Sequence, residues 1–226
     1  MRRPLNRILK KFGYEIVKRS RFYDLLEKMR REREHFTFVQ VGANDGVRFD
    51  NLYFFVTEKK CRGLVIEPLR DYFERLVVNY QDYLDIKPIR VALHPTLDKC
   101  TLHRVDPARA HELPHWAAGI ASFLPGHHAL SETPSEYMIQ EEVPCIPLMK
   151  LLQAENITGL DLLQIDTEGF DAEILKMLDF AVIAPRVIKY EHVGLSRDDR
   201  QDAEQRLRQQ GYKIFHEGGD TIAFKE

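Results

Sequence analysis

Short apolar runs alternate along the chain with stretches whose apolar residues recur at helical spacing, a pattern typical of alternating strands and helices. The short runs are rich in β-branched and aliphatic residues, and they predict buried strands at residues 37–41, 63–66, 86–93, 160–165 and 186–190. The amphipathic stretches predict helices at residues 50–59, 69–83, 148–154, 171–178 and 197–210. This order predicts an α/β fold with a parallel sheet.

Two segments depart from this alternation. Residues 99–148 contain two strand-like stretches, 99–105 and 139–146, which enclose a long loop rich in His, Pro and Gly. Long insertions in compact domains are usually functional, so we predict that this region forms part of a substrate wall. Near the end of the chain, residues 212–216 and 221–224 flank Glu217-Gly218-Gly219-Asp220, which predicts an antiparallel hairpin.

The strand at 37–41 ends in a turn bracketed by two glycines, Gly42 and Gly46. Glycine permits positive φ and lets a ligand approach the backbone without a Cβ in the way. The next strand ends in Glu67-Pro68, about 20 residues later, and a carboxylate at that point can accept both hydroxyls of a ribose. Strand, glycine turn, helix and carboxylate together predict the ligand-binding corner of a doubly wound fold.

The turn departs from the dinucleotide pattern G-x-G-x-x-G, because Asn44 stands at the position of the second glycine. With Asn44 and Asp45 in the turn, a negatively charged pyrophosphate would bind weakly. A nucleoside with a positive tail suits an acidic turn better, and the sulfonium of S-adenosylmethionine is such a tail. The turn therefore favours that cofactor over a dinucleotide.

The charge balance argues against a general nucleic-acid binder, because the net charge of the 226 residues is −2 rather than strongly positive. We predict no nucleic-acid partner. The distribution is uneven: residues 1–35 contain 12 Lys and Arg against 5 Asp and Glu. Helices are predicted there at 4–14 and 21–34, the second capped by Ser20. We divide the chain into residues 1–35, a basic helical lid or a segment docking on an anionic membrane, and a domain at 36–226.

The cysteines Cys61, Cys100 and Cys145 are widely separated and form no C-x-x-C, so they predict core positions rather than a disulfide framework or a zinc site. No apolar run approaches the roughly 20 residues that span a bilayer. The basic N-terminal stretch also lacks the apolar region of a secretory signal. We predict a cytoplasmic location, with peripheral membrane contact through residues 1–35 as an option.

Seven sequence blocks, in one order, resemble the FkbM-type methyltransferases. They include the turn Val41-Gly42-Ala43-Asn44-Asp45-Gly46 and the later Gln164-Ile165-Asp166-Thr167-Glu168-Gly169. The full set covers residues 41–46, 67–68, 90–93, 119–122, 143–148, 163–169 and 187–191. Such an ordered set is far more specific than any one motif.

The resemblance implies a doubly wound, Rossmann-like, seven-stranded and mostly parallel sheet with a C-terminal antiparallel hairpin, as in class I methyltransferases. It implies S-adenosylmethionine as methyl donor, S-adenosylhomocysteine as product, and a hydroxyl-bearing acceptor such as a sugar, glycan or natural product. Residue by residue, the expected cofactor-binding positions are Gly42, Ala43, Asn44, Asp45, Gly46, Glu67, Pro68, Ala92, Ser122 and Asp166.

Methyl transfer to a hydroxyl is helped by a general base that removes the proton as the new bond forms. Asp166 ends the fourth predicted strand and should face the methyl group and the acceptor. His192 is a candidate base because imidazole titrates near neutrality, and Glu191 and Glu168 compete with it if burial raises their pKa. Asp166 and Glu168 holding a divalent cation is the alternative, but we predict no metal site.

Some positions depart from the FkbM pattern: Gln164, Thr167, Phe170 and Ala121 stand where Lys, Val, Ala and Ser are common. These changes concern the acceptor side and leave the acceptor's identity open. His111-Glu112-Leu113-Pro114-His115 matches the zinc-protease pattern H-E-x-x-H, but Pro114 would interrupt the helix which that mechanism needs. The pair His127-His128 either faces the acceptor or lies in solvent.

Two further functions remain open at this point. A nicotinamide-dependent oxidoreductase has a similar sheet, although the missing glycines argue against it. A non-catalytic module that docks on glycans or membranes would keep the fold without turnover, and the basic residues 1–35 motivate it.

Overall fold

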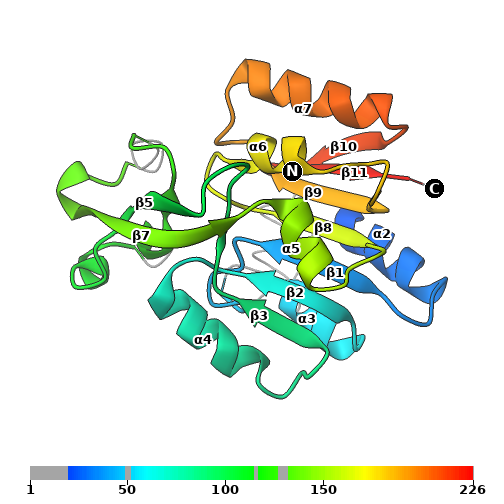
Figure 1. Ribbon diagram of the computed structural model, residues 1–226, viewed down its shortest axis with the longest axis horizontal. Helices are drawn as coiled ribbons and strands as arrows, with labels where there is room; N and C mark the ends of the chain where they lie inside the picture. Colours follow the sequence, from blue (N-terminus) through cyan, green and yellow to red (C-terminus); the bar gives the residue numbers. More distant parts are fainter. Residues whose placement is uncertain (1–19, 49–51, 115–116, 127–131, 226) are drawn as a thin grey trace, which may run out of the picture. The chain divides into compact units, whose positions relative to one another are not determined.

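The computed structural model describes residues 20–48, 52–114, 117–126 and 132–225 (Figure 1). The chain divides into two compact units, residues 1–34 and residues 35–226. Among the described residues, no helix is both long enough and apolar enough to cross a membrane.

The first unit contains helix α2 (Arg21–Arg31). The Ser20 hydroxyl accepts a hydrogen bond from the Tyr23 N–H at 3.3 Å, which is the predicted N-cap. Phe22, Leu26 and Met29 form the buried stripe of the helix, and the helix ends three residues before the predicted boundary. The predicted helix at 4–14 lies outside the described residues. The roles of residues 1–35 as a lid or a docking segment stay predictions.

The second unit is built on a seven-stranded sheet with strand order β10-β11-β9-β8-β1-β2-β3 (Figure 1). β1 pairs in parallel with β2 and β8, β11 pairs antiparallel with β9, and β10 and β11 form the predicted hairpin. This confirms the predicted class I methyltransferase arrangement. The strands are β1 (Thr37–Val41), β2 (Arg62–Ile66), β3 (Ile86–Ile89), β8 (Leu162–Ile165), β9 (Val187–Glu191), β10 (Lys213–Glu217) and β11 (Asp220–Phe224).

Helices connect the parallel strands, and the largest apolar cluster lies between the sheet and three of them. The helices are α3 (Leu52–Glu58), α4 (Arg70–Tyr80), α5 (Leu148–Ala154), α6 (Asp171–Met177) and α7 (Arg197–Gln209). Val39, Leu163 and Ile188 from adjacent strands pack with residues of α5, α6 and α7 in this cluster. Every residue of β1 and β8 is buried, so the central strands are covered on both faces, as is usual for a parallel sheet flanked by helices.

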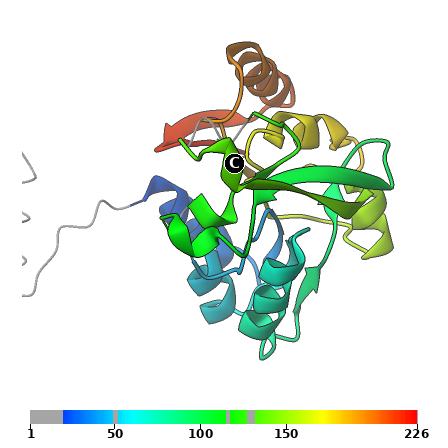
Figure 2. The same ribbon diagram turned by 90° about the vertical axis from the view of Figure 1, so that its left-hand side faces the viewer.

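The region predicted as an insertion, 99–148, forms a second sheet together with two residues that precede it. The strand order is β4-β7-β5-β6, from strands β4 (Ala92–Leu93), β5 (Lys99–Val105), β6 (Ala121–Ser122) and β7 (Met138–Ile146). In Figure 1 the long strands β5 and β7 lead away from the main sheet, and Figure 2 shows the molecule from their side. Short 3₁₀ turns, η1 (Ala110–Glu112), η2 (Ala117–Gly119) and η4 (Ser135–Tyr137), connect them.

One predicted strand, 86–93, is wrong as a single element. The main sheet keeps only Ile86–Ile89, and Ala92 and Leu93 pair instead with Cys145 and Ile146 of β7. Pro88 lies in β3, which is an edge strand, the position where a missing backbone donor is tolerated. The chain leaves the sheet after Ile89 because Ala92 and Leu93 find buried ladder partners in the second sheet.

The strand order reverses direction around β1, since the chain fills β2 and β3 on one side and returns to β8 on the other. Doubly wound folds bind ligands at this switch point, beyond the carboxyl ends of the two central strands. The turns that follow β1 and β8 therefore meet at one edge of the sheet.

Candidate functional site

The turn after β1 is held close to the turn after β8. Gly42 and Gly46 have φ of 77° and 79°, and Asn44, with φ of 52°, is also left-handed. A Cβ on Gly42 would lie 1.7 Å from the Asp166 carbonyl oxygen, so no larger residue fits without moving one of the two turns. The Asp166 N–H in turn donates to the Val41 carbonyl at 3.0 Å. The corner is thus one continuous backbone assembly.

Glu67 braces this corner from the tip of β2. One carboxylate oxygen accepts from the Asn44 N–H and the other from the Leu69 N–H, both at 2.9 Å. The side chain is buried, and burial raises the pKa of Glu67 to about 7, against the lowering effect of these hydrogen bonds and of Arg104. A carboxylate oxygen has two lone pairs, so the same atoms retain acceptor capacity for ribose hydroxyls.

The Asp45 carboxylate binds the backbone of its own segment. It accepts from the Val47 and Arg48 N–H groups at 3.1 and 2.8 Å, and the Arg48 guanidinium lies 3.4 Å from it. These contacts cap the backbone that follows the turn. Asn79 of α4 donates to the Asp45 carbonyl at 2.7 Å, which fixes the same segment from the other side.

Asp166 lies directly after β8, and its side chain is exposed to water. No described residue donates a hydrogen bond to its carboxylate. The protein packed around it nevertheless raises the pKa of Asp166 well above its usual range, with Glu191, Asp171 and Glu168 adding to that effect and Lys189 opposing it. An accessible carboxylate among other carboxylates makes this a place that favours a cation.

Asp171 is a buried carboxylate that the sequence analysis treats only as the start of a helix. It accepts from the Thr167 hydroxyl at 2.8 Å and from the Glu191 N–H at 3.1 Å, and so joins the turn after β8 to the end of β9. Burial raises the pKa of Asp171 to about 6. Its position five residues after Asp166 is visible in the sequence, but an acid at a helix start is normally an exposed cap.

The inserted region reaches both turns. The Ser122 hydroxyl donates to the Glu168 carbonyl at 2.7 Å and accepts from the Leu124 N–H at 3.1 Å. A Cβ on Gly119 would lie 2.5 Å from the Asn44 amide nitrogen, so this segment also touches the glycine turn. Phe123 packs against Phe170 with ring centroids 4.4 Å apart, and His94 stacks on Phe170.

Arg104 anchors the second sheet to α4 and is also missed by the sequence analysis. Its guanidinium binds both carboxylate oxygens of Asp71, at 2.7 and 3.0 Å, and one of Glu141 at 2.7 Å, with only 3% of its side chain exposed. The sequence does contain a signal, because Arg104 alternates with Cys100 and Leu102 on the buried face of β5.

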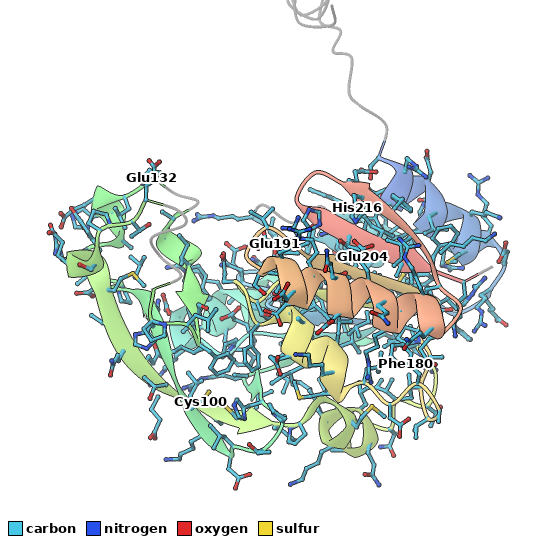
Figure 3. All side chains as sticks on the ribbon, turned by 90° about the horizontal axis from the view of Figure 1, so that it is seen from above. Cys100, Glu132, Phe180, Glu191, Glu204 and His216 are labelled. Atoms are coloured by element: carbon cyan, nitrogen blue, oxygen red, sulfur yellow. The ribbon has the colours of Figure 1, made fainter. Side chains whose placement is uncertain are left out.

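The predicted catalytic residues fall into two groups. Glu168, left-handed with φ of 52°, and Glu191 act electrostatically on Asp166. The His192 ring instead binds the Thr221 hydroxyl through Nδ1 at 2.9 Å and lies 5.4 Å from the His216 ring. Burial lowers the pKa of His192, and Arg200 and His216 add to that effect. Figure 3 labels Glu191, Glu204 and His216 at the end of the molecule formed by α7 and the hairpin.

The two remaining candidates for cofactor binding, Pro68 and Ala92, lie in different parts of the structure. Pro68 follows Glu67 and accepts a hydrogen bond from the Arg90 side chain at 3.4 Å. Ala92 is buried on β4, in the second sheet rather than at the end of the main sheet's third strand. Its role in cofactor binding stays a prediction, since the chain reaches Ala92 by a different route from the single strand 86–93 that the sequence predicted.

The structure contains no metal centre within its described part, where no three His, Cys, Asp or Glu side chains gather closely enough. In the H-E-x-x-H match, the 3₁₀ turn η1 ends at Glu112 and Leu113 is extended, so the pattern does not continue as a helix. His115, like His127 and His128, lies outside the described residues.

The family model for the methyltransferase FkbM domain matches residues 40–214, more than three quarters of the chain. This chain belongs to the FkbM methyltransferase family. The match spans both turns, Glu67 and the whole second sheet. The predicted cofactor, S-adenosylmethionine, is the methyl donor that membership of this family implies, and an acidic corner with close-approach glycines fits its cationic sulfonium.

Solved structures similar to this chain share little sequence identity with it. The METTL16 methyltransferase domain is 12% identical with a TM-score of 0.49, over 90% of this chain and 66% of that one. Fibrillarin, a pre-rRNA processing protein from Methanococcus jannaschii, is 12% identical with a TM-score of 0.45, over 86% and 68%. A human methyltransferase 10 domain-containing protein is 12% identical with a TM-score of 0.47, over 90% and 80%. No curated protein sequence matches at a significant level.

Proposed function

We propose that this FkbM-family methyltransferase transfers the methyl group of S-adenosylmethionine to a hydroxyl group, and that the acceptor is a carbohydrate. The observation that carries the proposal is Asp166, a water-accessible carboxylate with a raised pKa, in backbone contact with a left-handed glycine turn. A cation is favoured at that point, and a hydroxyl beside it would meet a proton acceptor.

In this proposal, the turn from Gly42 to Gly46 holds the amino-acid part of the donor and Glu67 accepts the ribose hydroxyls. The brace that Glu67 forms with the Asn44 N–H supports this, because it fixes the turn and the carboxylate relative to each other. The bound donor supplies an activated methyl carbon, so most of the protein's task is to position the acceptor oxygen in line with it.

The acceptor side is assigned to Asp166, Glu191 and Glu168, with His192 as the alternative base. Mutual proximity of the three carboxylates supports the first assignment. A base with a raised pKa, such as Asp166, gives a rate that rises with pH above the usual carboxylate range. The lowered pKa of His192 would put its rising limb below the ordinary imidazole range, and a His192→Asn variant would remove that limb.

The second sheet is proposed as the acceptor wall. Support comes from the contacts of Gly119 with Asn44 and of Ser122 with Glu168, which bring the region 99–148 to both turns. The half-buried rings of Phe123 and Phe170 offer an apolar face beside the turn after β8, and aromatic faces suit the C–H-rich faces of sugars.

The experiment is transfer of labelled methyl groups from S-adenosylmethionine to panels of hydroxyl acceptors, with RNA as a comparison. We expect labelled glycan, no labelled RNA and stoichiometric S-adenosylhomocysteine. Label in RNA would contradict both the acceptor class and the expectation from the net charge of −2 that the protein is not a nucleic-acid binder. Binding of S-adenosylhomocysteine without turnover on any acceptor would favour the non-catalytic module, and binding of NADH instead would favour an oxidoreductase.

A further inference from the structure

Three carboxylates lie in one row along the carboxyl-terminal edge of the main sheet. Glu191 ends β9 and pairs in register with Asp220, the first residue of β11. On its other side, Ile165, the last residue of β8, is level with Tyr190, and Asp166 and Glu191 are the residues that follow this pair. Residues in register on adjacent strands share a face, so Glu191 and Asp220 lie on one face, and Asp166 continues the line of β8 beside Glu191.

Such a row is unfavourable by itself, because like charges directly opposite each other on adjacent strands repel. The effect is present at Asp166, whose pKa is raised first by the surrounding protein and next by Glu191, ahead of Asp171 and Glu168. Something must offset this repulsion if Asp166 and Glu191 are to be carboxylates at neutral pH.

The next row on the same face contains the compensating charge. Gln40, Gln164, Lys189 and Ile222 are level with one another on β1, β8, β9 and β11. Lys189 is the charged member of this row, two residues before Glu191 on β9. Its ammonium lies 3.0 Å from the Asp220 carboxylate, and 17% of its side chain is exposed.

The ammonium acts on both ends of the acidic row. It is ion-paired with Asp220, and it is the cation that lowers the pKa of Asp166. A lysine with a largely buried stem holds its charge in a restricted place, and a charge in a partly desolvated place acts more strongly than one in bulk water.

We propose that Lys189 is a positioning residue for the site: anchored on Asp220, its ammonium allows Asp166 and Glu191 to stand side by side as carboxylates. That these carboxylates then face the methyl donor and acceptor rests on the proposed function. The charge balance among Asp166, Glu191, Asp220 and Lys189 does not rest on the proposed function, and it can be measured without any ligand.

The test is a pH titration of the Asp166 side-chain carbon by ¹³C NMR in protein labelled at aspartate, with the signal assigned by its loss in Asp166→Asn. The charged groups that face Asp166 are Glu191 and Lys189 of β9, Asp171 of α6 and Glu168 of its own turn. We expect Lys189→Met to raise the Asp166 midpoint by about 1 pH unit. Lys189→Arg, which keeps the charge, should leave the midpoint near the wild-type value.

Two further variants make the result specific. Asp220→Asn frees the ammonium from its partner, so the Asp166 midpoint should fall. Lys213→Met removes an exposed lysine of the same hairpin and should change nothing. An equal midpoint in Lys189→Met and Lys213→Met would overturn the proposal. If Lys189→Met does not fold, an unchanged midpoint in Asp220→Asn overturns it.

Binding of S-adenosylhomocysteine separates this proposal from the proposed function. Without Lys189, Asp166 stays protonated to higher pH, so Lys189→Met should bind about 10-fold more weakly near neutrality and regain affinity at alkaline pH. A loss that is equal at all pH values would indicate a structural role for Lys189 and contradict the proposal. Absence of binding in the wild type together with the expected NMR shifts would refute the proposed function alone.

Discussion

The two turns at the switch point both contain buried or desolvated carboxylates, but they use them differently. Behind the first turn, both oxygens of Glu67 accept backbone N–H groups, and Asp171 does the same behind the second. Asp166 receives no hydrogen bond from any described residue and is exposed to water. The satisfied carboxylates fix the backbone, and the Asp166 carboxylate keeps its acceptor capacity. We propose on this ground that the second turn is the reactive side of the corner.

Replacement of Asp166 should have the largest effect. Asp166→Ala should lower methyl transfer by about 10²–10⁴-fold, because it removes the carboxylate that we propose faces donor and acceptor. The melting temperature should stay the same or rise, since a carboxylate that lies among like charges is lost. Asp166→Asn, which keeps the shape, should be equally inactive. Turnover near the wild-type rate in either variant, measured as S-adenosylhomocysteine formed, would show that Asp166 is not needed for methyl transfer.

Gly42→Ala tests the contact between the two turns. The added Cβ would overlap the Asp166 carbonyl in a left-handed residue, so we expect destabilisation of about 3 kcal/mol or more, measured by urea unfolding. Gly211→Ala is the matched control, because Gly211 has φ of +82° with open space around its Cβ position. That variant should cost only about 1 kcal/mol. Equal losses would show that close approach of the turns is unimportant.

Glu67→Gln tests the brace of the first turn. A glutamine can accept at one oxygen only, so binding of S-adenosylhomocysteine should weaken by about 10-fold or more at pH 8. The raised pKa of about 7 also has a stability consequence, because the folded state holds a proton on Glu67 that the unfolded state has lost between about pH 4.5 and 7. Wild type should therefore become less stable as pH rises through this window.

Glu67→Gln should lack that part of the pH dependence, whereas Glu74→Gln, an exposed change on α4, should keep it. Thermal unfolding of the three proteins between pH 5 and pH 8 measures the difference. Parallel curves for wild type and Glu67→Gln would show that Glu67 titrates normally.

Gly119→Ala tests the contact of the second sheet with the first turn and should have the smallest effect. The new methyl group must displace the Asn44 side chain, which is flexible at its end, so we expect a few-fold increase in KM for S-adenosylmethionine and little loss of stability. Gly126→Ala, with nothing within 4 Å of its Cβ position, is the control. Identical KM values in the two variants would show that the contact of the second sheet with the first turn does not affect donor binding.

The sequence predicts most of the fold because burial and periodicity agree in most elements. Helix α5 begins and ends at the predicted residues, and the hairpin follows from its Gly-Gly turn. The segment 86–93 could not be resolved in this way, because an apolar run does not show which sheet will pair with it. Ala92 and Leu93 are apolar in either sheet, and only tertiary pairing assigns them to β7.

The site was predictable where backbone geometry demands a residue type. Gly42 and Gly46 have the positive φ that a glycine turn suggests, and Glu67 meets that turn. The charged residues around these positions were not predictable. Asp171, Arg104 and Lys189 are buried or half-buried only because of contacts with residues far along the chain. Charged side chains are mostly exposed, so sequence reasoning places them at the surface by default.

A crystal structure with S-adenosylhomocysteine bound tests the proposed site most directly. We expect the amino-acid part of the ligand against the turn from Gly42 to Gly46, the ribose hydroxyls on Glu67 and the sulfur facing Asp166. A ligand bound away from these two turns, with Asp166 still in contact with water, would contradict this expectation.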